Sequence, residues 1–279
     1  MRVRQYAGVA GTGKSRTVDP SSVAKAFDVH ARTYDKLVGA NPGYHEHLRL
    51  SAKRMGIAPR PGLRLLDLGC GTGASTAALL DAVPGAQVTA VDASAEMLGQ
   101  ARRKNWPPGV RFVHSRMEDL DRAGVQGPFD GILAAYLVRN LRDRDAGLAK
   151  MLELLAPGAP LAVHEYSVRD SVRSRLTWNL VCGMVIIPMG KLRTGSGDIY
   201  RYLRRSVVEF DGVSAFSDRM GRAGFEDIRV QTMDGWQTHV VHTFLGRRPT
   251  PAADDPLLDP AVAEVETPPE GLAQLDRTV

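Results

Sequence analysis

Short apolar runs alternate with amphipathic segments through the middle of the chain. Runs typical of buried strands lie at residues 64–68, 87–92, 110–114, 130–135 and 160–166, and helical spacing of apolar positions lies at residues 44–55, 74–82, 95–104 and 145–155. Ser94 is placed to cap the helix at 95–104, and Pro157-Gly158 ends the helix at 145–155. This alternation predicts a doubly wound α/β fold, in which helices cover both faces of a mostly parallel, Rossmann-like sheet.

The alternation stops after residue 166. An arginine-rich, partly apolar stretch follows to residue 210, then a helical pattern at 213–223 and two strand-like runs at 227–233 and 238–246. Asp234-Gly235 between these runs is typical of a tight hairpin turn. We therefore expect a seven-stranded sheet that ends in an antiparallel hairpin, with a helical lid insertion at about residues 168–212.

Both ends of the chain differ from the middle. Residues 1–20 are polar and glycine-rich, and residues 249–279 contain six prolines and seven acids against one base. Segments of this composition bury too little apolar surface to fold alone. We expect two flexible tails around one domain at residues 21–248, which begins with a helical pattern at residues 23–29.

Composition narrows the class of protein. A length of 279 residues with 43% hydrophobic residues suits one large globular domain. Two cysteines, Cys70 and Cys182, do not make a disulfide framework, which favours a reducing compartment and a cytoplasmic location. No apolar segment of signal-peptide length follows the start, and the longest apolar run, residues 180–189, is broken by Gly183 and Pro188 and is too short to span a bilayer.

Charge is distributed unevenly. The net charge is +5, and the last 31 residues contribute −6, so residues 1–248 carry +11. Eight bases face two acids between Arg169 and Arg205. Such a positive region attracts nucleic acid, an anionic membrane or an acidic substrate, and an ordinary solvated surface is the alternative.

The most informative motif is the strand at 64–68 with the turn that follows it. The apolar run contains Asp67 and is followed by Gly69, Gly71 and Gly73 at alternate positions. Glycines let the backbone pass close to a ligand, and the next helix directs its free N–H groups toward it. The same letters also satisfy a dinucleotide pattern through Ala74, so the glycines alone do not identify the nucleoside.

Two acids at strand ends decide between these ligands. Asp92 ends the strand at 87–92, where it is placed to accept both ribose hydroxyls, and Asp67 lies where a ligand ammonium would sit. This pair suits S-adenosylmethionine better than a pyrophosphate. The alternative is that both acids simply cap helices.

A second glycine motif matches a phosphate-binding pattern but lacks the sequence context that such a site needs. Residues 8–15 match the phosphate-loop pattern letter for letter. That loop needs a buried strand before it and a helix after it, whereas residues 1–7 are short with two arginines and Asp19-Pro20 follows. We therefore expect no ATP site there.

With these features in place, the chain resembles the class I S-adenosylmethionine-dependent methyltransferases and, more narrowly, the ubiquinone/menaquinone C-methyltransferase family. The resemblance spans about residues 23–248. It is carried by the glycine turn and by the segments at 27–35, 129–143, 157–158, 165–167, 200–203, 206 and 210. It implies a methyltransferase domain and the cofactor S-adenosylmethionine. At Tyr166 the chain departs from the family's usual Phe, which adds a hydroxyl near the expected substrate side.

The resemblance also implies a cofactor site. The methionine end is expected on the turn, the ribose on Asp92 and the adenine at Arg116-Met117, with Met97 on the ring and Ala135 beside the cofactor. Arg116 cannot accept a hydrogen bond from the adenine amino group, so Glu118 is expected to take over. The full expected set is Asp67, Gly69, Gly71, Thr72, Asp92, Met97, Arg116, Met117, Glu118 and Ala135.

Methyl transfer from a sulfonium needs alignment and exclusion of water but no metal. On a hydroquinone ring, loss of a phenolic proton activates the ring carbon. The candidates for this step are Arg139 and Asn140 after the strand at 130–135 and Tyr34 in a segment that folds over the cofactor. Arg139 would stabilise the phenolate while a water takes the proton. An ion pair of Arg139 with Asp35 or Asp143 is the alternative.

The expected acceptor is a small hydrophobic aromatic molecule, a prenylated quinol of the demethylmenaquinol type or a similar aromatic lipid. Residues 178–210 would cover its tail, or would form an extra core layer. The candidate substrate contacts are Trp178, Tyr200, Tyr202 and His242, although a structural role for His242 is the alternative. Competing functions are C- or O-methylation of a secondary metabolite and a non-catalytic basic binding protein.

Nucleic acid is not expected as a partner, because the basic cluster lacks interleaved aromatic residues. Two further possibilities are a peripheral contact with the inner face of an anionic membrane and the formation of a homodimer.

Overall fold

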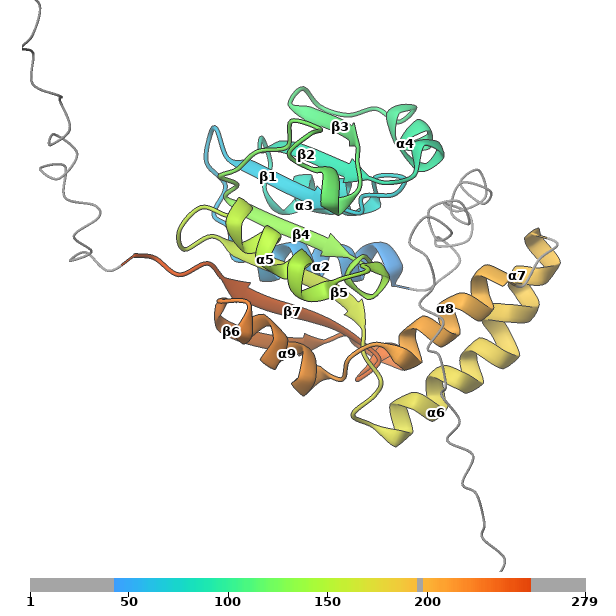
Figure 1. Cartoon of the computed structure of the whole chain (residues 1–279). Helices are drawn as coiled ribbons and strands as arrows, with labels where there is room; N and C mark the ends of the chain where they lie inside the picture. Colours follow the sequence, from blue (N-terminus) through green and yellow to red (C-terminus); the bar gives the residue numbers. More distant parts are fainter. Residues whose placement is uncertain (1–42, 195–197, 252–279) are drawn as a thin grey trace, which may run out of the picture.

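The computed structural model describes residues 43–194 and 198–251. Seven strands form one sheet in the order β3-β2-β1-β4-β5-β7-β6 (Figure 1). Neighbours are parallel from β3 to β5, whereas β7 runs antiparallel to both β5 and β6. The strands are β1 Arg64–Leu68, β2 Gln87–Asp92, β3 Val110–His114, β4 Gly131–Ala135, β5 Pro160–Tyr166, β6 Glu226–Thr232 and β7 Val241–Arg247.

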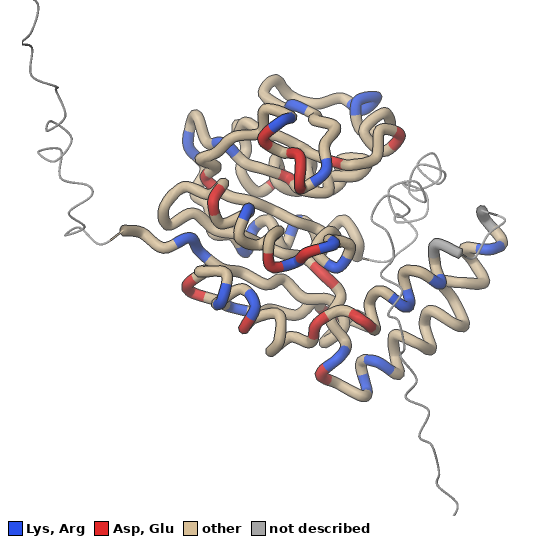
Figure 2. The backbone as a smooth tube through the Cα atoms, viewed as in Figure 1, with Lys and Arg blue, Asp and Glu red and all other residues tan. Residues whose placement is uncertain are grey.

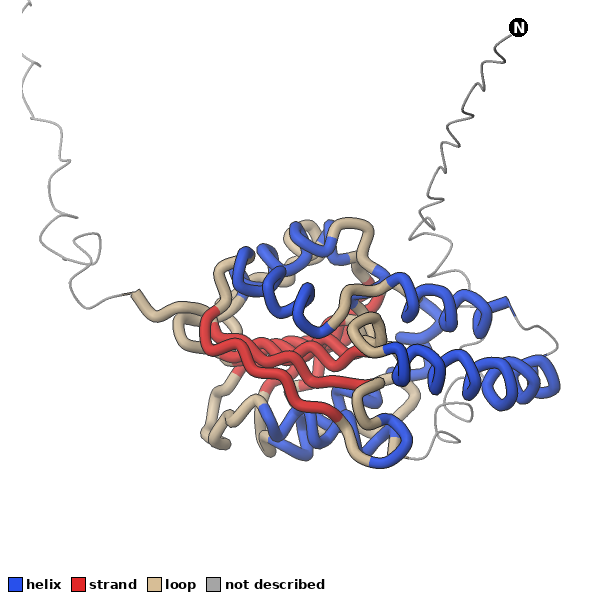
Figure 3. Tube along the Cα trace, turned by 90° about the horizontal axis from the view of Figure 1, so that it is seen from below, coloured by secondary structure: helices blue, strands red, loops and turns tan. Residues whose placement is uncertain are grey.

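Helices cover both faces of the sheet, as Figure 3 shows in a view turned by 90°. The layer helices are α2 Tyr44–Arg54, α3 Ala74–Ala82, α4 Ala95–Arg102, α5 Arg144–Leu154 and α9 Val213–Arg222. Alternation along β1 explains the two layers. Leu66 packs in a core with residues of α5 and α9, and Leu65 packs on the other face with residues of α2 and α3.

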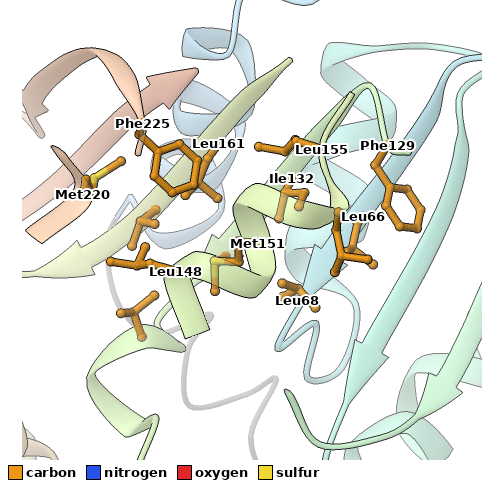
Figure 4. Close-up of a cluster of buried hydrophobic side chains, with 14 of the residues drawn as sticks. Leu66, Leu68, Phe129, Ile132, Leu148, Met151, Leu155, Leu161, Met220 and Phe225 are labelled. Atoms are coloured by element: carbon orange, nitrogen blue, oxygen red, sulfur yellow. The ribbon is translucent and has the colours of Figure 1, made fainter. Parts of the chain in front are cut away.

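The larger core lies under α5 and α9 (Figure 4). Leu66, Ile132, Leu148 and Met151 have no exposed surface, so burial of each side chain stabilises the fold by about 1.5–3 kcal/mol. Ser94 caps α4, because its hydroxyl accepts a hydrogen bond from the N–H of Met97. The expected doubly wound fold is thereby confirmed.

The last connection differs from the expected tight turn. Asp234-Gly235 does not join β6 to β7 directly, because a short 3-10 helix, Gly235–Gln237, and a residue with positive φ, His239, lie between them. The Thr232 hydroxyl accepts a hydrogen bond from the N–H of His239, which closes a wider loop. The predicted antiparallel end of the sheet is confirmed, and the prediction of a two-residue turn was wrong.

Residues 172–194 and 198–209 form a helical insertion. It comprises α6 Val172–Val181, a π-helix Cys182–Ile186, α7 Ile187–Thr194 and α8 Asp198–Glu209. Both Figure 1 and Figure 3 show these helices extending away from the end of the sheet at which β5 ends. Trp178, Cys182 and Val207 join the insertion to Tyr166 and Val241 in a third buried cluster.

Several expectations fall outside the described residues. These are Tyr34, Asp35, the motif at residues 8–15, the helical pattern at 23–29 and most of both tails. Within the described part, no helix combines the length and apolar character that crossing a membrane requires.

Candidate active site

The glycine turn lies between β1 and α3. The N–H groups of Gly69 and Cys70 both donate to the carbonyl of Val91, which ties the turn to β2. At Gly71, with φ +53°, an added Cβ would meet nothing within 4 Å, so this position faces open space. At Gly73, with φ +92°, a Cβ would lie 2.6 Å from the ring of Trp106. Glycine is therefore required for conformation at the first position and for both conformation and space at the second.

A small cleft opens beside this turn. Its walls come from α2, the turn, the first residues of α3 and the residues that follow β4, namely Tyr44, Gly69, Cys70, Gly71, Thr72, Ala74, Ser75, Ala135 and Tyr136. It therefore lies outside the carboxyl ends of β1 and β4, where the strand order of the sheet reverses. In open α/β sheets, this position is where ligands bind.

Asp67 lies behind the turn and is fully buried. Its Oδ2 accepts hydrogen bonds from the hydroxyls of Ser75 (2.8 Å) and Thr76 (2.6 Å) in α3. Its Oδ1 is buried without a hydrogen-bond partner among the described residues. Burial raises the pKa of Asp67 to about 7, although the hydrogen bonds from Thr76 and Ser75 act to lower it. Asp67 does not cap α3, because in the described part of the chain it accepts only from side-chain hydroxyls and the N-cap residue of α3 is Gly73.

Asp92 at the end of β2 connects the turn to α4. Its Oδ2 accepts from the N–H of Gly71 (2.7 Å), and its Oδ1 accepts from the N–H of Ser94 (2.8 Å). These contacts orient the carboxylate beside the turn, and a carboxylate oxygen can accept more than one hydrogen bond. The structure thus brings both predicted acids to one turn.

The residues predicted at the adenine follow β3 or lie in α4. Arg116 and Glu118 are exposed, Met117 is half-buried in a 3-10 helix, Met117–Asp119, and Met97 is buried. The N–H of Ser115 donates to the carbonyl of Asp92, which holds this loop against the end of β2. These side chains therefore lie on the β2–β3 side of the turn.

Arg139 lies after β4, in a 3-10 helix Val138–Asn140, and is buried in an ion pair. Its guanidinium donates to Glu165 Oε1 at 2.6 Å and to the carbonyl of Tyr136 at 3.0 Å. Burial opposes the charge of Arg139, but Glu165, Tyr166 and Tyr202 together outweigh it and raise the pKa of Arg139. Burial raises the pKa of Glu165 against the effect of Arg139. The ion-pair alternative is thus observed with a different acid, because Asp143 instead caps α5 through the N–H of Ala146.

Asn140 is oriented from both sides. Its amide nitrogen donates to the carbonyl of Tyr136 (3.0 Å), and its oxygen accepts from the hydroxyl of Tyr202 in α8 (2.9 Å). Burial raises the pKa of Tyr202. The predicted residues Arg139, Asn140 and Tyr202 therefore meet around one backbone carbonyl at the base of the insertion.

The remaining candidates for substrate contact are mostly buried. Trp178 is fully buried, packs on Tyr166 with ring centroids 4.7 Å apart and donates to the carbonyl of Arg204. Tyr200 packs against Gly190 of α7, inside the insertion. His242 lies opposite Glu165 on β7, and burial lowers its pKa to about 4. The structure thus brings Trp178 near the Arg139 group and keeps Tyr200 within the insertion.

Tyr136 and Glu165 were missed by the sequence analysis. Tyr136 lines the cleft with φ +56°, and its ring contacts those of Tyr44, His164 and Tyr166. The signal was its place directly after the strand at 130–135, where ligand groups gather in such sheets. Glu165 has the analogous place near the end of β5. Among the described residues, no group of three metal-ligating side chains comes together.

Comparison with known proteins agrees with this geometry. The model of the ubiE/COQ5 methyltransferase family matches residues 15–244. A demethylmenaquinone methyltransferase of Clavibacter sepedonicus is 30% identical over 210 residues, 75% of this chain and 84% of that protein. A ubiquinone/menaquinone biosynthesis C-methyltransferase UbiE of Shewanella halifaxensis is 34% identical over 179 residues, 62% of this chain and 70% of that protein.

Solved structures support the fold. Haemonchus contortus phosphoethanolamine N-methyltransferase 2 in complex with S-adenosyl-L-methionine has a TM-score of 0.61 at 17% identity, and the match covers 84% of this chain and 61% of that chain. The [4+2]-cyclase SpnF also has a TM-score of 0.61, at 16% identity over 83% of this chain and 97% of that one. The chain therefore belongs to the ubiE/COQ5 methyltransferase family and is an S-adenosylmethionine-dependent methyltransferase.

Proposed function

We propose that this enzyme methylates a ring carbon of a prenylated quinol of the demethylmenaquinol type. The proposal rests on the names of the relatives and on one observation, the buried Arg139–Glu165 pair next to Tyr136 on the wall of the cleft. A buried cation there stabilises a phenolate, which is the form of a quinol that attacks through carbon. Membership in a methyltransferase family removes the alternative of a non-catalytic basic protein.

The turn fits the cofactor. Gly71 faces open space, and the buried Oδ1 of Asp67 has no partner among the described residues, so an ammonium or a bridging water would satisfy it. We infer that Gly69, Gly71 and Thr72 hold the methionine end and that Asp92 holds the ribose. Met97, Arg116, Met117 and Glu118 would surround the adenine, and Ala135 would lie beside the cofactor.

S-adenosylmethionine supplies an activated methyl group when it is bound. The residues of this chain then have to place the acceptor carbon in line and exclude water. Arg139 stays charged in its ion pair, so it stabilises the phenolate and is not the base; a water takes the proton. Asn140 and Tyr202 would orient the ring, and Tyr34 is predicted to close over the cofactor from the segment before α2.

The insertion is the inferred cover for the acceptor's tail. Aromatic rings lead from the cleft toward it, with centroids 4.9 Å apart for Tyr136 and Tyr166 and 4.7 Å for Tyr166 and Trp178. A prenyl chain would lie along this aromatic series. C- or O-methylation of a soluble secondary metabolite is the competing function, because the same cleft would hold it without using the insertion.

The test is to incubate the protein with labelled S-adenosylmethionine and either a demethylmenaquinol or a lipid extract and to identify the product by mass. Methylation at a ring carbon of a quinol is expected. Methylation only of soluble phenols, or only at oxygen, would contradict the proposal. Asp92→Ala should lose cofactor affinity, whereas Asp81→Ala, which removes an exposed carboxylate paired with Arg49, should keep it.

We also propose that the insertion docks on the inner face of an anionic membrane. Apolar side chains along one helical run are exposed, at 65% for Val172, 65% for Leu176, 58% for Leu180, 67% for Met184 and 87% for Leu192. Residues 172–194 contain no acid, and Figure 2 shows the bases of this region along the same helices. Exposed apolar groups between bases suit an anionic interface.

Arg173, Arg175 and Lys191 are exposed, and each base near an anionic surface contributes about 1 kcal/mol. Vesicles with anionic lipid should therefore bind the protein about a hundredfold more tightly than neutral vesicles at low salt. Leu176→Glu combined with Leu180→Glu should abolish binding. Equal binding to both vesicles would contradict the proposal, and so would a concentration-dependent dimer that buries this face and prevents vesicle binding.

A further inference from the structure

A line of buried polar groups runs from the cleft to the opposite side of α2. The hydroxyl of Tyr136 lies 2.9 Å from Nε2 of His164, and Nδ1 of His164 lies 2.8 Å from the hydroxyl of Ser51. Ser51 in turn contacts the hydroxyl of Thr243 at 2.8 Å, and the Arg54 guanidinium donates to Thr243 Oγ1 at 2.8 Å. Four elements, α2, β5, β7 and the end of β4, contribute to this chain.

The arginine sets the direction of every bond in the chain. A guanidinium donates and cannot accept, so Thr243 Oγ1 accepts from Arg54. Thr243 is fully buried, and its other side-chain contact is Ser51. If Ser51 donated to Thr243, the Thr243 proton would be buried without an acceptor, which is unfavourable. Thr243 therefore donates to Ser51, and Ser51 donates to Nδ1 of His164.

The state of His164 agrees with this direction. Burial, together with the neighbouring His47, Arg54 and His242, lowers the pKa of His164 to about 3, so the ring is neutral. A neutral ring that accepts at Nδ1 carries its single proton on Nε2. Nε2 then donates to the Tyr136 hydroxyl, which leaves the Tyr136 proton for another acceptor.

Arg139 and Tyr166 lie beside Tyr136, the end of the chain. The guanidinium carbon of Arg139 lies 5.8 Å from the ring centroids of both Tyr136 and Tyr166. The Tyr136 hydroxyl also forms a hydrogen bond with Tyr166, so its proton has a resting partner. A cation that lies over both phenol rings makes their surroundings favourable for an oxygen that gains negative charge.

We propose that the chain from Arg54 to His164 makes Tyr136 a hydrogen-bond donor to the phenolate oxygen of the acceptor. The inference rests on the proposed function for the identity of that oxygen. Because the chain begins at an obligate donor, it cannot carry a proton away. Tyr136 therefore stabilises the phenolate that Arg139 faces and does not act as a base.

The first test needs no substrate. The His164 tautomer is read from long-range ¹⁵N–¹H NMR correlations of the full-length protein. A proton on Nε2 is expected, and a proton on Nδ1 would overturn the proposal even if quinol methylation is confirmed. Ser51→Ala removes the donor to Nδ1, so the share of His164 rings with the proton on Nε2 should fall. Ser217→Ala, which removes a hydroxyl bonded within α9, is the matched control and should change nothing.

The second test uses turnover. Tyr136→Phe keeps the ring but removes the donor, so kcat should fall about ten- to a hundredfold and the rise of kcat with pH should move to higher pH. Ser51→Ala should produce the same two changes in smaller measure, and the double variant should be no worse than Tyr136→Phe alone. Independent, multiplied losses or an unmoved pH profile would overturn the proposal. If no quinol is methylated at all, the proposed function fails, and the tautomer still tests the chain.

Discussion

The buried carboxylate of Asp67 should make the stability of the protein depend on pH in a defined way. Asp67 has no exposed surface, and burial raises its pKa from the ordinary value of 3.8 to about 7. Between these values the folded protein holds a proton that the unfolded chain has released. The stabilising contribution of protonated Asp67 is therefore complete below pH 3.8 and is lost as the pH rises through about 7.

The magnitude follows from the size of the shift. One pKa unit corresponds to about 1.4 kcal/mol, so the shift from 3.8 to about 7 represents roughly 4 kcal/mol in total. Asp67→Asn removes the titration. Between about pH 5 and pH 7 the free energy of unfolding of the wild type should fall by roughly 2 kcal/mol relative to that of the variant.

The measurement is urea denaturation of both proteins without cofactor at several pH values, compared as a difference. The difference matters because His164 and His242, with pKa values lowered to about 3 and about 4, contribute slopes of opposite sign in both proteins. Asp81→Asn, which changes an exposed carboxylate, is the control and should stay within about 0.5 kcal/mol of the wild type. A difference between wild type and Asp67→Asn that does not vary with pH would refute the reasoning.

Three further outcomes are expected. Glu165→Gln leaves Arg139 buried without its counter-charge and should lower the free energy of unfolding, measured in urea, by about 3–5 kcal/mol. Asp119→Asn at the exposed pair with Arg122 should lower it by under about 1 kcal/mol, and equal losses would contradict the importance of the buried pair. Gly73→Ala should lower the melting temperature more than Gly62→Ala. Both glycines have positive φ, but only a Cβ at Gly73 would meet another group, the Trp106 ring, so equal losses would mean that this ring moves freely. Burial raises the pKa of Cys70 and raises that of Cys182 to about 12, so neither thiol should react with Ellman's reagent at pH 8 until urea unfolds the protein. Fast reaction of the folded protein would show that one of the two thiols is accessible.

Local patterns were sufficient for most of the fold. The apolar runs at 64–68, 87–92 and 160–166 became strands with those bounds, because a strand inside a covered parallel sheet needs a mostly apolar run. The run at 110–114 also kept its bounds and became the edge strand β3. The glycine turn, the Ser94 cap and the two acids were also visible, since each depends on residues close together in sequence. The prediction of a tight turn at Asp234-Gly235 was wrong because a hydrogen bond across the connection, from the His239 N–H to the Thr232 hydroxyl, favours a wider loop.

The partners of buried polar groups were decided only by the tertiary structure. Arg139 pairs with Glu165 because β4 and β5 are neighbours in the sheet, and local spacing suggested Asp143 instead. Ser51 and Thr243 are 192 residues apart, and they meet only because α2 packs across β5 and β7. Hydrophobic periodicity states which face of an element is buried, but strand order decides which side chains share that face. The sequence by itself therefore determined the cofactor turn and the family resemblance, and the assembled sheet determined which groups surround the acceptor.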